Sequence, residues 1–144
     1  MIYKHIQKGY LMWCILVIMM ILFGSILLKA EILWSAVIIM TLVIIILASF
    51  STLKVEIYEQ NLFVTFGYGI YKKKFNINEI NSCKEVKNHW YYGWGIRYWW
   101  KPSMWIYNVS GFKAVEITLK NGEIYRIGTD EPNKLNQVIL TLIK

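Results

Sequence analysis

The chain begins with an almost unbroken apolar block and then changes to an alternation of apolar and polar residues. Residues 9–28 are twenty positions without a charge, and residues 32–50 add nineteen more. Each run is long enough to cross a bilayer core of about 30 Å, which takes about 20 apolar residues as a helix. One helix through both runs would bury Lys29 and Glu31 at the membrane centre, at about 2.5 kcal/mol or more for each charge. The pattern predicts two transmembrane helices, 9–28 and 32–50, joined by a tight turn at Lys29–Glu31.

A cleaved signal peptide is the alternative interpretation of the first apolar run. Signal peptides have an apolar region of about 7–15 residues, which small residues and a polar mature chain follow. The first run is longer and the second follows at once, which favours the anchor. Lys4, Lys8 and Lys54 flank the outer ends of the helices, whereas Lys29 in the turn is balanced by Glu31. The positive-inside rule therefore predicts both termini, and the polar part of the chain, on the cytoplasmic side of the membrane.

Residues 53–128 alternate with a period of two, which is typical of half-buried strands. Asn121-Gly122 is the strongest hairpin signal, because a type I′ turn requires positive φ at both central residues. Beyond the last strand, Thr129 or Asp130 can cap a helix and Pro132 suits its first turn. We expect one C-terminal helix after seven antiparallel strands, at residues 53–59, 62–66, 70–75, 80–86, 105–109, 112–119 and 123–128.

The composition fits a membrane protein with one small polar domain. The chain has 144 residues, is 56% hydrophobic and carries a formal net charge of +7, whereas about 45–50% apolar residues is usual in soluble proteins. Residues 1–52 form the predicted membrane anchor. Residues 53–144 form the predicted domain, which is long enough for a modest core. Cys14 falls in the anchor and Cys83 in the domain, so a disulfide framework is not expected.

Several short stretches resemble small bacterial membrane proteins that carry a bacterial pleckstrin-homology-like (PH-like) domain. These stretches are residues 94–97, 105–111, 114–117, the Asn121-Gly122 turn and residues 126–132, of which the last is the most specific. The resemblance covers residues 53–144. It implies an α+β fold in which a PH-like antiparallel β-barrel or sandwich of about seven strands follows the helical hairpin and ends in a capping helix. Within this group the chain is most similar to sublancin-type bacteriocin immunity proteins, which implies a role in protecting a bacterial cell from the peptide.

Residues 88–107 concentrate aromatic and basic side chains and form the main candidate binding segment. Aromatic residues with a polar group suit both the membrane interface and the anchoring of a partner. Neighbouring residues of a strand point to opposite faces, so Trp99 and Trp100 cannot both face a core. Alternatively, half of these rings pack the sheet, with Trp105 and Tyr107 in or near the core. The predicted membrane-binding or partner-binding residues here are Trp90, Tyr91, Tyr92, Trp94, Arg97, Trp99, Trp100 and Lys101.

A basic run, residues 72–74, lies on a predicted strand near the membrane. Alternation places Lys72 and Lys74 on one face of this strand and the lysine between them on the other. A lysine near an anionic leaflet contributes about 1 kcal/mol, so Lys72 and Lys74 are candidate lipid contacts that would share a patch with Arg97 and Lys101. The alternative is a solvated edge strand, where lysine discourages aggregation. Nucleic acid is not expected as a partner, because the basic residues are dispersed and no recognition module is visible.

No catalytic, cofactor or metal site is predicted. The polar part has one histidine, His89, and its spacing from Cys83 matches no zinc motif. A nucleophile and base made of these two would also need an orienting group. The glycine pairs at 67–69 and 93–95 precede no helix, as a phosphate-binding loop requires. Arg126 is expected to pair with Glu116 or Glu123 across its hairpin.

The chain is therefore predicted to act by binding rather than catalysis. Its expected partners are the lipid bilayer and a bacteriocin peptide or the membrane target of that peptide. The alternative is a membrane-tethered PH-like adaptor that binds another membrane protein through an exposed edge or groove.

Overall fold

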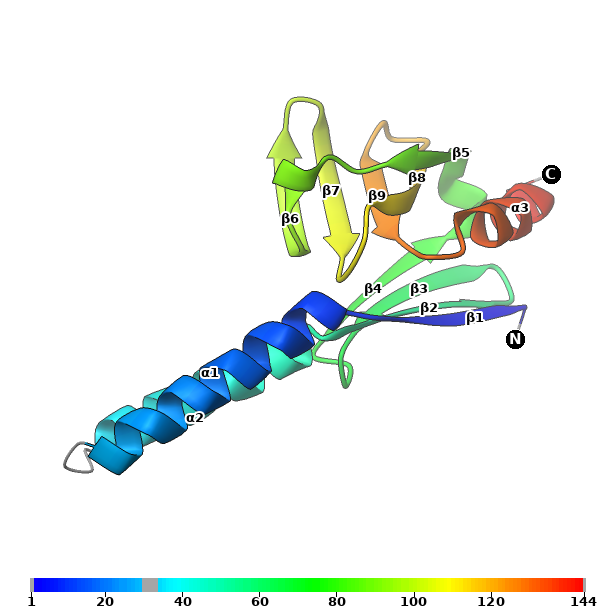
Figure 1. Cartoon of the computed structure of the whole chain (residues 1–144). Helices are drawn as coiled ribbons and strands as arrows, with labels where there is room; N and C mark the ends of the chain where they lie inside the picture. Colours follow the sequence, from blue (N-terminus) through cyan, green and yellow to red (C-terminus); the bar gives the residue numbers. More distant parts are fainter. Residues whose placement is uncertain (1, 30–33, 144) are drawn as a thin grey trace.

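The computed structural model describes residues 2–29 and 34–143. Two apolar helices project from one end of a body that contains two β-sheets and a C-terminal helix (Figure 1). The α+β class expected from the sequence is confirmed. The predicted turn after Lys29 falls on residues 30–31, outside the described residues.

The two N-terminal helices, α1 (Tyr10–Lys29) and α2 (Trp34–Ser49), lie side by side and run in opposite directions (Figure 1). Helix α1 has 20 residues with a mean hydropathy of 2.8 and is almost entirely exposed, so it is long and apolar enough to cross a membrane. Helix α2 is equally apolar but has 16 residues. Both are apolar around their whole circumference, unlike a surface helix of a soluble protein, which keeps one polar face.

The first sheet contains β1 (Tyr3–Lys8), β2 (Thr52–Tyr58), β3 (Asn61–Phe66) and β4 (Tyr71–Asn76), in that spatial order and all antiparallel. Strand β1 was not predicted, because its six residues were assigned to the membrane anchor. In the structure they pair with β2 from Tyr3↔Ile57 to Lys8↔Thr52. The chain before the helices thus belongs to the same sheet as the chain after them.

Strand β1 is also tied to the start of the C-terminal helix α3 (Pro132–Ile143). His5 points inward from β1 and pairs with Asp130, and its second ring nitrogen lies 3.6 Å from Glu131. The Thr129 hydroxyl accepts a hydrogen bond from the Glu131 backbone N–H at 3.1 Å, directly before the first residue of the helix, Pro132. Asp130 and Glu131 therefore contact strand β1 and also lie directly before the first residue of helix α3.

The second sheet has the order β5-β8-β9-β7-β6. Its strands are β5 (Ile80–Lys87), β6 (Gly95–Trp100), β7 (Ser103–Asn108), β8 (Lys113–Leu119) and β9 (Ile124–Gly128). The described residues therefore form nine strands instead of seven, since β1 and β6 were missed. The 3-10 turns η1 (Ile77–Glu79) and η2 (Trp90–Tyr92) precede β5 and β6.

The expected fully antiparallel arrangement is wrong at one pair, because β7 and β9 are parallel. Strand β9 is hairpin-paired with β8, and β7 joins the far side of β9. The short link 109–112 must therefore pass the end of β9 to reach β8. A side chain at Gly128, the last residue of β9, would begin 2.2 Å from Asn108 Oδ1. Residue 128 must therefore be glycine, because the link 109–112 crosses the end of β9 at this position.

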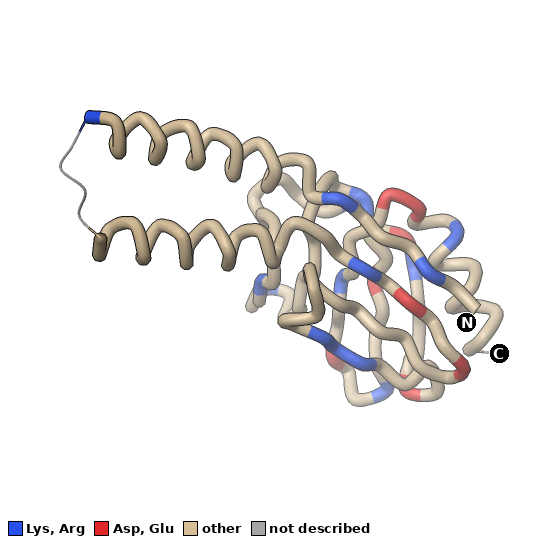
Figure 2. The backbone as a smooth tube through the Cα atoms, turned by 90° about the horizontal axis from the view of Figure 1, so that it is seen from below, with Lys and Arg blue, Asp and Glu red and all other residues tan. Residues whose placement is uncertain are grey.

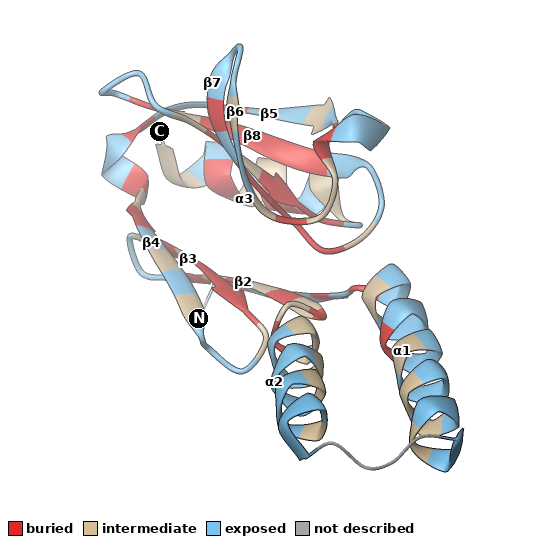
Figure 3. Ribbon diagram, turned by 90° about the vertical axis from the view of Figure 1, so that its left-hand side faces the viewer, coloured by how far each residue is buried: buried red, intermediate tan, exposed pale blue. Residues whose placement is uncertain are grey.

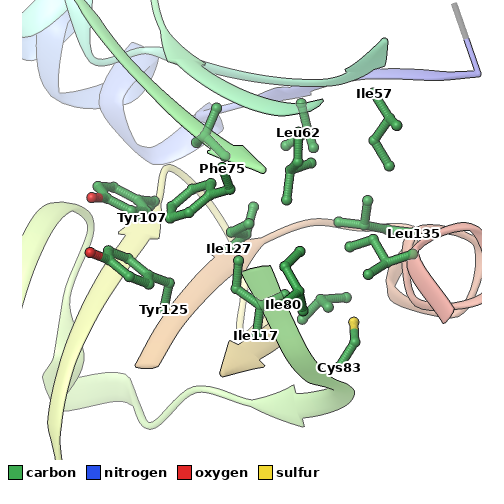
Figure 4. Packing of buried hydrophobic residues seen from close by; sticks show 14 of the residues in the cluster. Ile57, Leu62, Phe75, Ile80, Cys83, Tyr107, Ile117, Tyr125, Ile127 and Leu135 are labelled. Carbon is green, nitrogen blue, oxygen red and sulfur yellow. The ribbon is translucent and has the colours of Figure 1, made fainter. Parts of the chain in front are cut away.

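The main core lies between the two sheets, and α3 closes one end of it (Figures 3 and 4). Alternate residues of β2 and β3 point into it, and Tyr107 and Tyr125 face them from the second sheet with their rings stacked at 6.2 Å. Leu135 and Ile139 of α3 are fully buried. Burial of each large apolar side chain contributes about 1.5–3 kcal/mol.

Candidate functional site

The aromatic segment folds back across the outer face of the second sheet, the face turned away from the main core. Met104 and Ile106 of β7 point to this face and are buried there beneath Tyr92, with Trp99 and Ile124 packed against them. Strand β7 therefore has apolar residues on both faces, and the second face needs a cover. Turn η2 supplies this cover and forms a second, smaller core.

Five rings, which we call the aromatic cap, lie on this small core: His89, Trp90, Tyr91, Tyr92 and Trp99. His89 stacks on Tyr91 with ring centroids 4.9 Å apart and planes inclined by 6°. Tyr92 contacts Trp99 at 5.0 Å, and Tyr91 lies 5.6 Å from Trp99. Trp90 packs edge-on against Tyr91 at 6.0 Å and keeps 76% of its surface exposed. The cap thus has a buried base, Tyr92, and an exposed outer ring, Trp90.

A partly buried ionic network lies beneath the base of the cap. Arg126 Nε donates to Glu116 Oε2 at 2.7 Å, and Lys84 Nζ lies 3.0 Å from the other carboxylate oxygen. The Arg126 guanidinium also lies 5.6 Å from the centre of the Tyr92 ring, within cation–π range. The predicted pairing of Arg126 with Glu116 is confirmed.

Two opposing effects set the pKa of the Glu116 carboxyl. Its burial alone would raise the pKa, but the hydrogen bonds and positive charges of Lys84 and Arg126 outweigh burial and lower the pKa below its ordinary value. The carboxylate is therefore ionised at neutral pH and keeps Arg126 in place under Tyr92. Tyr92, held by Arg126, therefore gives the exposed rings of the aromatic cap a rigid support.

A second group of aromatic residues lies along β6, the edge strand of the sheet. Tyr98 packs on Trp105 at 5.1 Å, and its hydroxyl is 2.7 Å from Ser103 Oγ. Trp100 is 81% exposed, and Lys101 follows it in the β6–β7 turn. We call Tyr98, Trp100 and Trp105 the aromatic edge. A depression of about 340 Å³ beside it is lined by Tyr98, Trp99 and Trp100.

The alternation along β6 explains which of the two tryptophans is partly buried. Trp99 faces the small core, whereas Trp100 faces the opposite side and is largely exposed. The expectation that these neighbours cannot both face a core is confirmed. Tyr98 was not among the predicted binding residues, because no strand was predicted over residues 87–104. Recognising β6 as a strand would have placed Tyr98 on the same face as Trp100.

Trp94 and Arg97 lie apart from both groups. The Trp94 ring packs near Phe112 at 6.5 Å, and its buried indole N–H has no hydrogen-bond partner among the described residues. The Arg97 side chain folds back and donates to the Trp94 carbonyl at 3.4 Å. These two residues form a local contact at the start of β6.

The basic run lies on the other sheet. Lys72 is on the outer face of β4, with its ammonium 4.4 Å from the Phe63 ring centre, and Lys74 is exposed on the same face. Lys73 points inward and lies 5.5 Å from the Tyr125 ring. The predicted alternation is confirmed. The expected single patch of Lys72 and Lys74 with Arg97 and Lys101 is wrong, because the two pairs are on different sheets.

The residues weighed for catalysis are also separated. Cys83 is buried in the main core, and burial together with the nearby Glu85 carboxylate raises the pKa of its thiol to about 12. His89 belongs to the aromatic cap on the outer face. Within residues 2–29 and 34–143, no group of three His, Cys, Asp or Glu side chains gathers as metal ligands would. The arrangement offers rings and charges for binding.

Comparisons with protein-family models, curated proteins and solved structures find no match to this chain. The function is therefore inferred from its residues and their geometry.

Proposed function

We propose that this chain is a membrane-anchored, non-catalytic immunity protein, which protects a bacterial cell against a sublancin-like bacteriocin. It would do so by binding the peptide, its membrane target or adjacent lipid. The observation that carries the binding part is the exposure of Trp90 and Trp100 on a rigid, ionically supported sheet. Large exposed aromatic side chains on a rigid support are typical anchors of binding surfaces.

The membrane anchor is supported by α1 and α2, most of whose large apolar side chains are exposed. Such helices are stable in lipid, where the surroundings are apolar too. We propose that they form a transmembrane hairpin. Both helices connect to neighbouring strands of the first sheet, β1 and β2, so the two sheets lie on one side of the bilayer. The lysines at this end favour the cytoplasmic side.

We also propose that the sheets and α3 form a bacterial PH-like domain. Two packed sheets followed by a single C-terminal helix that covers one end of the core support this assignment. Strand β1 and the parallel pair β7–β9 depart from the seven-stranded antiparallel pattern. These departures involve the N-terminal strand and the hairpin that carries the aromatic edge.

A protection assay tests the proposed function. The chain and a Trp90→Ala/Trp100→Ala variant are expressed in a bacteriocin-sensitive strain, and inhibitory concentrations of a sublancin-type peptide and an unrelated peptide are compared. We expect selective resistance from the unaltered chain and at least a fivefold loss of resistance in the variant at equal abundance. Tyr58→Ala is the matched control, because Tyr58 is an exposed aromatic residue on the first sheet. Absence of resistance from correctly inserted protein contradicts the immunity role.

The second candidate function is a membrane-tethered adaptor, which the free edge of β6 favours. Among the described residues, strand β6 pairs with a neighbour on one side alone, so alternate backbone N–H and C=O groups remain available to an added strand. Photo-crosslinking from position 100 separates the two functions. Crosslinks to the added bacteriocin support immunity by peptide binding, whereas a crosslinked resident membrane protein without any resistance supports the adaptor.

A further inference from the structure

We infer that two turns beside the helix exits form a second contact with the membrane and rest in the headgroup layer of an anionic bilayer. The turns are residues 67–70, between β3 and β4, and residues 109–112, between β7 and β8. We call them the membrane-facing turns. This inference rests on the membrane anchor proposed above and adds the surface by which the sheets would meet the leaflet.

The helices join the first sheet without a linker. Gly9 alone separates β1 from α1, and its N–H donates to the Ser51 carbonyl at 2.7 Å. On the other side, two residues separate α2 from β2. The helices continue roughly along the direction of β1 and β2 (Figure 1). Whatever lies beside this junction is therefore held at a fixed depth relative to the end of each helix.

The first membrane-facing turn is held against the end of α2. The Gly67 N–H donates to the Thr52 carbonyl at 2.9 Å. Gly67 has a φ of +52°, and a side chain there would begin 2.0 Å from the Ser49 carbonyl oxygen, so glycine permits this approach. The next residues leave large apolar surfaces uncovered: Tyr68 is 93% exposed and Ile70 is 68% exposed.

The second membrane-facing turn is held against the other side of the junction. The Gln7 side-chain amide, buried in β1, donates to the Ser110 carbonyl at 2.9 Å. Phe112 in the same turn keeps 42% of its surface exposed. The two turns thus flank the helix exits, and each carries an exposed aromatic side chain. Tyrosine and tryptophan are enriched at membrane–water interfaces, which fits Tyr68 in the first of these turns.

The charges beside the turns fit an anionic leaflet. On the outer face of the first sheet, Lys8 ends β1, while Lys54 and Lys72 flank Thr65 close to the helices (Figure 2). Strand rise is about 3.3 Å per residue, so Lys72 lies within a Debye length of about 8–10 Å from Ile70. Glu56 is the one acidic residue on the outer face of the four described strands, and Lys54 pairs with it at 3.0 Å.

Depth measurements on the full chain test this contact. A nitroxide is attached at Tyr68→Cys in a Cys14→Ala background, and the protein is reconstituted in bilayers of phosphatidylcholine with 30% phosphatidylglycerol. We expect the label at 68 to be at least threefold more accessible to oxygen, relative to a water-soluble nickel chelate, than a label at Tyr58→Cys. Position 58 is the matched control because it is exposed at the opposite end of the same sheet. Cys83 is buried and is retained.

A label on native Cys14 in α1 separates failure of the turns from failure of the anchor. If the Cys14 label lies in the hydrocarbon while the label at 68 is as aqueous as that at 58, the inferred contact is overturned and the anchor stands. If the Cys14 label is itself exposed to water, the proposed anchor is wrong, and the inferred contact, which depends on the anchor, is overturned as well. Tyr68 is almost fully exposed, so its substitution is expected to leave the fold intact, as circular dichroism would verify.

Discussion

The two sheets bury apolar residues in different ways. The first sheet has one buried face, since β2 and β3 turn their apolar residues to the main core and present Lys54, Phe63 and Thr65 outward. The second sheet is buried on both faces in its middle, because the aromatic cap covers Met104 and Ile106. A sheet with one buried face leaves its other side free to carry charge. A sheet that is buried on both faces instead supports rigid aromatic rings on a packed layer of apolar side chains.

The residue patterns explain this difference. Strand β2 alternates strictly along Leu53–Tyr58, so a single face can be apolar. Strand β7 has four consecutive apolar or aromatic residues, 104–107, so it must be covered on both sides. The cover comes from a segment that is itself aromatic. The second sheet therefore uses part of the candidate binding segment for its own stability.

The largest expected effect comes from the main core. Phe66 is fully buried and contacts Tyr107 and Phe50 with ring centroids 6.1 Å and 5.7 Å apart. Phe66→Ala is expected to lower the free energy of unfolding by about 3–5 kcal/mol, because it leaves a cavity between the sheets. Urea unfolding of detergent-solubilised protein, followed by tryptophan fluorescence, measures this change.

The matched control is Phe63→Ala, three residues earlier on the outer face. Phe63 is partly exposed and contacts the Lys72 ammonium, so we expect a loss of about 1 kcal/mol or less. Equal losses at 63 and 66 would contradict the one-faced character of the first sheet.

The second sheet is expected to be sensitive on its outer face as well. Ile106 is fully buried beneath Tyr92, away from the main core. Ile106→Ala should lower the free energy of unfolding by about 2–4 kcal/mol through loss of apolar burial and a residual cavity. The same urea titration measures it. A loss below about 1 kcal/mol would show that the aromatic cap does not pack on the sheet in solution.

This contrast also explains what could be predicted from the sequence. The strict alternation of β2 and the Asn121-Gly122 signal act locally, and the strands that depend on them were found. The predicted type I′ turn is wrong, because Gly122 has a positive φ but Asn121 does not. The C-terminal helix was found and begins at Pro132. Strand β1 was missed because its pairing with β2 spans the two helices, and no local signal records such a partner. Strand β6 was missed because tryptophans and glycines obscure its alternation.

For the candidate site too, local features could be predicted from the sequence, whereas features that depend on the topology could not. The exposure of Trp100 and the partial burial of Trp99 against Tyr92 follow from strand alternation and a local turn. The separation of Lys72 from Arg97 depends on which sheet each strand joins, and that requires the topology. Residue type therefore indicated candidate binding side chains, whereas their grouping required the structure.

The next largest effect concerns the ionic support of the cap. Glu116→Gln is expected to lower the free energy of unfolding by about 2 kcal/mol at pH 7, because Arg126 and Lys84 lose a charged acceptor. The folded-state pKa of Glu116 lies below its ordinary value of 4.5. The stabilisation is therefore full above about pH 4.5 and is lost as the pH falls through the folded-state pKa.

Urea titrations between pH 3 and pH 7 test this linkage. The stability of the unaltered chain should approach that of Glu116→Gln at the acidic end, and the difference should grow as the pH rises. Glu79→Gln is the control, because Glu79 is exposed and forms no ion pair with the described residues. Stability curves for the unaltered chain and Glu116→Gln that remain parallel over this range would refute the role assigned to the carboxylate.

The smallest effects distinguish two adjacent tryptophans. Trp99 packs against Tyr92 at 5.0 Å and belongs to the base of the cap, whereas Trp100 faces solvent on the opposite side of β6. Trp99→Ala is expected to cost about 1–2 kcal/mol, since the ring is half-buried, and Trp100→Ala about 0.5 kcal/mol or less. Circular dichroism is the readout, because fluorescence changes with each substitution.

If Trp100→Ala is the more destabilising variant, its ring is part of the fold rather than free for a partner. If the expected order holds while Trp100→Ala abolishes protection, the effect of Trp100 on protection comes from contact with a partner and not from stability.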